Sequence, residues 1–311
     1  MEEFHSEVFT GLEALNLPVV RWSRFARGGF SATPWPPDGP FGSVLLRLPR
    51  SKEALAMALH AGAGVLERGG TVLVYGAKDE GIASATGPME EVLSEVDTLG
   101  VGGRCRVLQG RKMKELEGLR RTLGDWKQRG IPAWEGLPGP WISYPGVFAH
   151  GRLDPGTRRL LEVLPGLHPG DRVLDYGCGS GVVGAVALHR EPGIELHLLD
   201  IDAIALEAAR ENVPGGITTL GDGLSEVGPA SFHHLLSNPP FHRGKDEDPE
   251  MLRVFVREAG RVLRPGGGLT FVTQRRISLD DVLGSSFKDV NLLARDSTFV
   301  VWQARGPRGR E

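Results

Sequence analysis

The chain has 311 residues, of which 40% are hydrophobic and 24% charged, and a formal net charge of −3. These values are typical of a folded protein with about two domains, and they exclude predominant disorder. No apolar run is long enough to cross a membrane, and the acidic start of the chain is unlike a secretory signal. The two cysteines exclude a disulfide framework, so we expect a cytoplasmic protein.

The first predicted elements form a strand–helix–strand unit. We expect a strand at 43–48, a helix at 51–66 and, after Gly69 and Gly70, a second strand at 71–74. Only about 40 residues precede this unit, and no glycine cluster follows its first strand. The unit is therefore too short to be a complete nucleotide-binding half.

A basic segment follows at residues 104–129. It contains nine basic and three acidic residues, which gives a net charge of +6. Two interpretations remain open, a solvated helix face and a surface that binds the phosphates of a nucleic acid. On the second interpretation, the candidate phosphate contacts are Arg111, Lys112, Arg120 and Arg121.

Repeated Pro and Gly residues divide the chain near its middle. They exclude a helix over 130–146 and weaken any strand there. We interpret 131–146 as a linker between two domains, 1–130 and 147–305. A short basic tail at 306–311 ends the chain.

The C-terminal domain alternates short apolar strands with helical patterns. The expected strands are 172–176, 195–199, one that ends at 237, and 269–273; the expected helices are 182–189, 203–212 and 249–263. This alternation predicts a parallel sheet covered on both faces. The ranges 289–295 and 298–304 predict an antiparallel hairpin at one edge.

The N-terminal unit repeats the order of elements at 234–273. In both places a strand and a helix are followed by a Gly-Gly pair and another strand. We interpret this as an internal duplication, in which the N-terminal copy is degenerate.

The strongest motif is Val-Leu-Asp-Tyr-Gly-Cys-Gly-Ser-Gly at 173–181. A buried strand ends here, and its glycines permit a sharp turn and a close approach of a ligand to the backbone. At the end of the next predicted strand, Asp200 is well placed to accept hydrogen bonds from two ribose hydroxyls.

Residues 179–184 also match the Gly-x-Gly-x-x-Gly fingerprint of dinucleotide-binding proteins. The carboxylate of Asp175 argues against that cofactor, because it has the same sign of charge as a pyrophosphate. A cofactor with a sulfonium and an ammonium group would instead be attracted to it.

Over about residues 145–305 the chain resembles the class I S-adenosylmethionine-dependent methyltransferases. The resemblance implies an α/β, Rossmann-like domain with a seven-stranded, mostly parallel sheet, and S-adenosylmethionine as the cofactor. It implies that the cofactor contacts Phe148, Asp175, Gly177, Cys178, Gly179, Gly181, Asp200, Ile201, Asp222, Gly223 and Asn238. From the residues alone, Asp222 could also be a turn residue and Cys178 a small packing residue.

The sequence Ser-Asn-Pro-Pro-Phe at 237–241 follows the fourth predicted strand of this domain. Two prolines end a strand and create a rigid loop at its carboxyl end, where open α/β sheets bind ligands. The oxygens of Asn238 and Pro239 can accept both hydrogens of an exocyclic amine, while Pro240 stiffens the loop and Phe241 can stack on a base. The motif resembles that of amino-group methyltransferases acting on nucleic acids or on protein glutamine.

The stretch 146–157 narrows the resemblance to the RsmC-type ribosomal RNA small-subunit (guanine 2-amino) methyltransferases. That family pairs a degenerate methyltransferase-like N-terminal domain with an active C-terminal one, as the duplication predicts. The resemblance implies transfer of a methyl group to the 2-amino group of a guanine, with 16S ribosomal RNA as the expected substrate.

The expected partner is ribosomal RNA or a ribosomal subunit, and we expect a monomer without a metal ion. Zinc is disfavoured because His233, His234 and His242 lack metal-ligand spacing with Cys or acidic residues. Four alternatives remain open: a large-subunit guanine methyltransferase, a protein glutamine methyltransferase, a binding scaffold without catalysis, and an NAD-dependent oxidoreductase. The basic segment disfavours the glutamine enzyme, because a small protein substrate needs no phosphate-binding surface.

Overall fold

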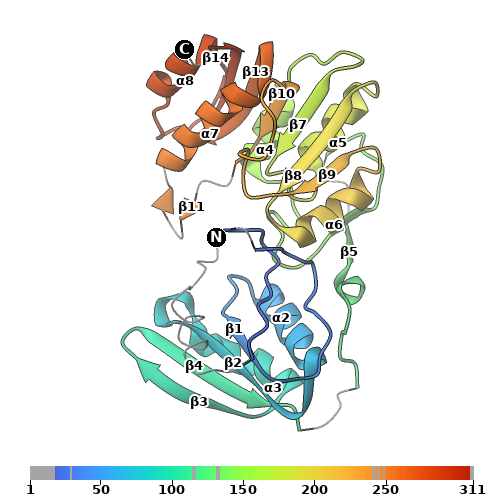
Figure 1. Ribbon diagram of the computed structural model, residues 1–311, viewed down its shortest axis with the longest axis vertical. Helices are drawn as coiled ribbons and strands as arrows, with labels where there is room; N and C mark the ends of the chain where they lie inside the picture. Colours follow the sequence, from blue (N-terminus) through green and yellow to red (C-terminus); the bar gives the residue numbers. More distant parts are fainter. Residues whose placement is uncertain are drawn as a thin grey trace.

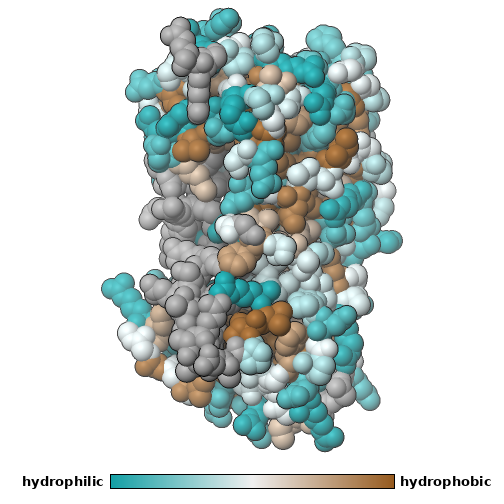
Figure 2. Space-filling model, viewed as in Figure 1, coloured by the Kyte–Doolittle hydropathy of each residue, from teal (hydrophilic) through white to brown (hydrophobic). Residues whose placement is uncertain are grey.

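The computed structural model describes residues 18–28, 30–113, 117–130, 134–239, 242–243, 246–247 and 249–308. Figure 1 shows two α/β domains, the N-terminal one below and the C-terminal one above, with β5 on the connection between them. Hydrophilic and hydrophobic residues are interspersed on the face shown in Figure 2. Within the described ranges, no helix combines the length and apolar composition that a membrane crossing requires.

The C-terminal domain is built on a seven-stranded sheet in the order β14-β15-β13-β10-β7-β8-β9. Its strands are β7 (Arg172–Tyr176), β8 (Glu195–Asp200), β9 (Ile217–Leu220), β10 (Phe232–Ser237), β13 (Leu263–Gln274), β14 (Phe287–Arg295) and β15 (Phe299–Pro307). Strands β13, β10, β7, β8 and β9 are parallel, and β14 and β15 form an antiparallel hairpin at one edge. The predicted seven-stranded, mostly parallel fold is confirmed.

Helices cover both faces of this sheet (Figure 1). They are α4 (Pro155–Glu162), α5 (Val182–Arg190), α6 (Ala203–Asn212), α7 (Pro249–Val262) and α8 (Asp280–Ser286). Because successive strand residues point to opposite faces, Leu235 joins the buried cluster that includes α7 and α8, while Leu236 joins the cluster that includes α4, α5 and α6. The two cores hold the carboxyl ends of β7 and β10 side by side.

The N-terminal domain is a four-stranded sheet with the order β1-β2-β4-β3. Its elements are β1 (Phe41–Arg47), α2 (Lys52–Val65), β2 (Leu66–Ala77), α3 (Thr86–Val92), β3 (Ser94–Gly102) and β4 (Cys105–Arg111), with short 3-10 turns at Lys78–Glu80, Ile82–Ala85 and Leu123–Trp126. The first pair of strands is parallel and the other two pairs are antiparallel, as in the β10-β13-β15-β14 half of the larger sheet. The N-terminal domain is thus methyltransferase-like but corresponds to only half of the fold.

The first glycine of each Gly-Gly turn has nearly the same positive φ. Gly69 has a φ of 83° and Gly266 a φ of 80°, a region that side chains rarely adopt. A Cβ on Gly70 would lie 3.1 Å from the carbonyl oxygen of Gly42, and one on Gly267 would lie 3.0 Å from that of His233. The two Gly-Gly turns are therefore similar in backbone geometry as well as in sequence.

The segment predicted as a linker contains a buried strand. Strand β6 (Trp141–Ser143) pairs with β5 (Gln128–Gly130), and all three of its residues are buried. The amide group of Asn212 accepts a hydrogen bond from Ile142 N at 2.8 Å and donates one to Ile142 O at 2.9 Å. This segment is consequently packed against the C-terminal domain.

A segment near the start of the chain also contacts the C-terminal domain. Ala26 N donates to Ile201 O, and Ala203 N donates to Arg24 O, each at 2.8 Å. The guanidinium of Arg24 forms an ion pair with Asp202, in which Nε lies 2.8 Å from Oδ1. At the other end of the chain, β15 runs to Pro307, so the predicted tail begins inside a strand.

The described residues of the basic segment 104–129 do not form the helix that the solvated-face interpretation required. Residues 105–111 form strand β4, and Lys112 is 3% exposed with Nζ donating to Leu66 O at 2.8 Å. Lys112 was therefore wrong as a phosphate contact, because its charge is not on the surface. Arg120 lies over the ring of Trp126, at 4.4 Å from the centroid, and Arg111 lies 3.8 Å from Glu95.

Candidate functional site

A cavity of about 500 Å³ lies at the carboxyl end of β7. Its lining includes six residues that the sequence predicts to contact the cofactor: Phe148, Asp175, Gly177, Cys178, Gly179 and Asn238. These residues come from three separate parts of the chain, which the fold brings together: the loop before α4, the end of β7 with the glycine loop, and the residue that follows β10. The volume lies within the range of pockets that bind small molecules.

The glycine loop forms the floor of this cavity. Gly177, Gly179 and Gly181 have φ values of 67°, 54° and 89°. Such dihedrals strain any residue with a side chain, and a Cβ on Gly181 would also lie 2.8 Å from a methyl group of Val213. The loop therefore requires glycine for its conformation and, at its third position, for packing against the end of α6.

Side chains from β6 and α6 hold the glycine loop in place through Ser180. Trp141 Nε1 donates to Ser180 Oγ at 3.2 Å, and Asn212 Nδ2 donates to Ser180 O at 2.9 Å. The strand β6 thus joins the glycine loop to α6.

Asp175 is 1% exposed, and one of its oxygens accepts a hydrogen bond from Gly184 N at 2.8 Å. Burial raises the pKa of the Asp175 carboxyl to about 7, and the charge of Asp200 acts in the same direction. The carboxyl of Asp200 is 9% exposed and accepts from Gly179 N at 2.7 Å and Asp202 N at 2.9 Å. Burial, and after it the charge of Asp202, raises the pKa of Asp200 to about 6. Two carboxyl groups beside the loop are thus costly to ionise until a cation approaches them.

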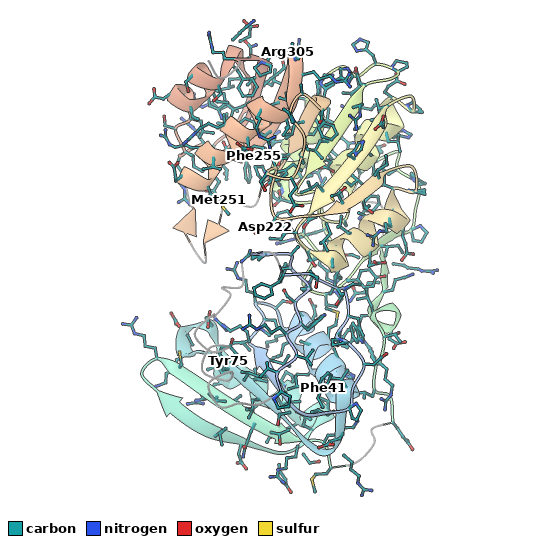
Figure 3. The ribbon with its side chains drawn as sticks, in the orientation of Figure 1. Phe41, Tyr75, Asp222, Met251, Phe255 and Arg305 are labelled. Atoms are coloured by element: carbon teal, nitrogen blue, oxygen red, sulfur yellow. The ribbon has the colours of Figure 1, made fainter. Side chains whose placement is uncertain are left out.

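The predicted cofactor residues Ile201, Asp222 and Gly223 do not line the cavity. Ile201 follows Asp200, and its carbonyl accepts the hydrogen bond from Ala26 N. Asp222 is exposed, and Figure 3 places it at the lower edge of the C-terminal domain, on the side of the N-terminal domain. A Cβ on Gly223 would lie 3.9 Å from Tyr176 Oη, so this turn is close to the end of β7. Their roles stay predictions.

The acceptor loop begins where β10 ends. Ser237 Oγ donates to Tyr176 O at 2.7 Å, which ties β10 to the carboxyl end of β7. Asn238 Nδ2 donates to Asp154 Oδ2 at 2.9 Å and to Thr157 Oγ1 at 2.8 Å. Pro239 is buried. The predicted residues Pro240 and Phe241 lie outside the described residues.

Sequence reasoning missed several polar residues around Asn238. Asp154 and Thr157 were part of a recognised stretch but were given no role, although Asp154 followed by Pro155 is the signal of a helix N-terminus. The cavity is also lined by three exposed arginines, Arg129, Arg152 and Arg158. Among the described residues, none of these guanidinium groups is paired with a carboxylate.

The histidines considered above as possible metal ligands lie elsewhere. His233 and His234 are within 3.8 Å and 3.4 Å of Asp171, which is next to the start of β7 and therefore at the opposite end of the strand from the cavity. The side chain of His242 lies outside the described part. Among the described residues, no group of three His, Cys, Asp or Glu side chains could hold a metal ion.

Two protein families match the chain. The "Methyltransferase small domain" matches residues 140–303, and the "Methyltransferase small domain N-terminal" matches residues 27–128. Both matches fall within the domains that the structure contains.

Similar proteins extend over nearly the whole chain. A protein of Hahella chejuensis named ribosomal RNA small subunit methyltransferase C is 31% identical over 317 residues, which covers 95% of this chain and 88% of that protein. A protein of Pseudomonas aeruginosa with the same name is 33% identical and covers 86% of this chain and 80% of its own length.

One similar solved structure is described as T. thermophilus 16S rRNA N2 G1207 methyltransferase (RsmC) in complex with AdoMet and guanosine. Its TM-score is 0.75 at 26% sequence identity, and the match covers 88% of this chain and 76% of that one. The similarity therefore includes both domains and their arrangement.

Proposed function

The chain belongs to the family of ribosomal RNA small subunit methyltransferases C, and we propose that it transfers a methyl group from S-adenosylmethionine to the 2-amino group of a guanine in small-subunit ribosomal RNA. The observation that carries this proposal is the position of Asn238, whose amide reaches the same cavity as the glycine loop. We further propose that the protein acts as a monomer.

The residues of the cavity fit S-adenosylmethionine better than a dinucleotide. Asp175 lines the cavity and would repel a pyrophosphate, whereas a sulfonium and an ammonium group favour its ionised form. A Cβ on Gly179 would meet nothing within 4 Å, so the backbone at this position is open to a ligand. Asp200, which orders the loop through Gly179, would hold the ribose, and Phe148 would cover the methionine end.

Binding experiments distinguish the two cofactor classes directly. We expect calorimetry to show saturable binding of S-adenosylmethionine and of its demethylated product, and no binding of NAD at the same concentrations. Binding of NAD alone would instead support the oxidoreductase interpretation.

The bound cofactor supplies an activated methyl group on a sulfonium. The chain itself contributes orientation: the Asn238 side-chain oxygen and the Pro239 carbonyl accept the hydrogens of the amine. These bonds localise the nitrogen lone pair and become stronger as the nitrogen gains positive charge in the transition state. The base must leave its helix stack to reach the cavity, as in other enzymes that modify bases.

Cofactor affinity is expected to rise with pH between about 5 and 8. The pKa values of Asp175 and Asp200 are raised to about 7 and about 6, so both groups are partly protonated at the lower pH. A cationic cofactor favours their ionised forms, and binding must therefore release protons. Calorimetry in buffers of different ionisation enthalpy measures this release.

The variant Asp175→Asn is the control for this prediction. It cannot ionise at position 175, so the pH dependence of affinity should become shallower. A wild-type affinity that is constant over this pH range, without proton release, would contradict the proposed role of the two carboxylates.

We propose that Arg129, Arg152 and Arg158 bind phosphates next to the target nucleotide. All three are exposed and line the cavity, and they come from β5, from the loop before α4 and from α4 itself. Exposed cationic side chains that line the cavity are suited to contact the phosphates of a nucleotide that enters it. We propose that the N-terminal domain contributes to RNA placement through the exposed Arg120 and Arg121.

Arg152→Ala is expected to weaken RNA binding and to flatten its salt dependence. Each lost phosphate contact should reduce the slope of log affinity against log salt by about 0.7–0.9. Lys288→Ala is the matched control, because Lys288 is exposed at the start of β14, at the opposite end of the sheet from the cavity. Equal slopes for both variants would exclude Arg152 as a phosphate contact.

A further inference from the structure

We propose that Asp154 and Thr157 are positioning residues that hold the Asn238 amide with its oxygen toward the reacting amine. This inference rests on the proposed function for the identity of the reaction. It concerns the N-cap residue of α4 and a residue in the first turn of that helix, 84 and 81 positions away from Asn238 in the sequence, rather than the acceptor motif itself.

Counting donors and acceptors shows why the amide has one orientation. A primary amide has two hydrogens on nitrogen, and those of Asn238 meet Asp154 Oδ2 at 2.9 Å and Thr157 Oγ1 at 2.8 Å. Both hydrogens are therefore used within the protein. No donor among the described residues bonds to the amide oxygen, which remains to accept a bond from a ligand.

The opposite orientation of the Asn238 amide, with its oxygen and nitrogen exchanged, would be unfavourable. It would place the amide oxygen against a carboxylate oxygen, and a carboxylate has no hydrogen to donate. Two acceptors would then face each other without a bond in a partly buried site, which costs the desolvation of both. The chemistry of Asp154 thus selects the same orientation that the geometry shows.

The two positioning residues are themselves held rigidly. Asp154 is the N-cap of α4, and the same Oδ2 accepts from Thr157 N at 2.9 Å. Thr157 is 7% exposed. Arg159 on α4 donates to Asp296 at 2.7 Å, which anchors the helix to the turn between β14 and β15. Because its N-terminus is capped and Arg159 ties it to this turn, α4 can hold the amide of Asn238 in place.

The arrangement also explains selectivity for an amine. An outward amide oxygen accepts N–H groups and repels a carbonyl oxygen or an unprotonated ring nitrogen. The bond from Nδ2 to the Asp154 carboxylate is charge-assisted and polarises the amide, so its oxygen becomes a stronger acceptor. That effect is largest when the amine nitrogen becomes positive during methyl transfer.

The first test compares two substitutions at one position. Thr157→Val keeps the side-chain volume and the backbone N–H that Asp154 caps, but it removes the hydroxyl acceptor. We expect kcat to fall about tenfold with little change in the KM for RNA or in cofactor affinity. Thr157→Ser restores the hydroxyl and should recover most of the activity. An equal loss in both variants, or a Thr157→Val enzyme with wild-type kcat, would overturn the proposal.

The second test does not depend on enzymatic activity, because it measures side-chain amide protons by NMR. The chain has only four Asn and four Gln residues, so each side-chain amide pair can be resolved by NMR. Loss of one pair in Asn238→Asp assigns the Asn238 signals. Asn212, whose two hydrogens bond to Ile142 O and Ser180 O, is a protected reference, and the exposed Asn291 is an unprotected one.

We expect both Asn238 amide protons to exchange slowly, like those of Asn212, and one of them to lose protection in Thr157→Val. Rapid exchange of both in the wild-type protein would overturn the inference. A protein that shows the protection but methylates no RNA would contradict the proposed function alone, so the two failures can be told apart.

Discussion

Asn238→Ala is expected to lower kcat by about 100-fold or more, the usual cost of removing one preorganised group that acts in the transition state. Asn238 directly follows β10 and lies beside the glycine loop, and Asp154 and Thr157 hold its side-chain amide. Its oxygen therefore needs no reorganisation when the amine begins to carry charge. Cofactor affinity should change little, because the interaction strengthens only as the reaction proceeds. Single-turnover assays on ribosomal RNA measure the effect.

Two variants control for this result. Asn291→Ala removes an exposed amide from β14 and should leave kcat unchanged. Asn238→Asp retains an acceptor and should keep part of the activity, although its carboxylate would face that of Asp154. Near-full turnover of a folded Asn238→Ala enzyme would contradict the amino-methylation mechanism.

Asp200→Ala is expected to weaken binding of S-adenosylmethionine by about 1.5–3 kcal/mol, or roughly 10- to 150-fold. The change removes the proposed acceptor for the ribose hydroxyls. It also removes the acceptor for Gly179 N, at 2.7 Å, and so loosens the loop that surrounds the methionine part. Calorimetry at a pH near 8, where the wild-type carboxyl is ionised, gives the largest difference.

The control for that loss is Asp289→Ala. Asp289 is exposed on β14, away from the cavity, and the substitution removes the same charge from the same domain. If Asp200→Ala folds and binds the cofactor as tightly as Asp289→Ala does, Asp200 is not the ribose acceptor.

Local sequence patterns predicted most of the C-terminal fold. The strand 172–176 and the helix 203–212 have the predicted limits, because an apolar run and a helical period are both properties of neighbouring residues. The glycine loop was also predictable, since its dihedrals demand glycine at fixed spacing. The repeated Gly-Gly turn likewise allowed us to predict an N-terminal domain that is an incomplete copy of the C-terminal one.

Contacts between distant residues were not predictable in this way. Nothing local to Asn238 indicates that its amide is held by α4, and nothing near Arg24 indicates a bond to Asp202, 178 positions later. The basic segment was ambiguous for a similar reason, because composition gives the number of charges but not their burial. Lys112 is inside the domain because the end of β4 turns it toward Leu66 O.

Mass spectrometry of the modified nucleoside identifies most directly the atom that receives the methyl group. The purified protein would be incubated with methyl-labelled S-adenosylmethionine and small ribosomal subunits from a strain that lacks the endogenous enzyme. We expect one labelled 2-methylguanosine per small-subunit RNA, at the position corresponding to the guanine modified by the T. thermophilus protein. With Asn238→Ala we expect this product to form at least about 100-fold more slowly. Label on another atom of the base, on large-subunit RNA or on protein would contradict the proposed function.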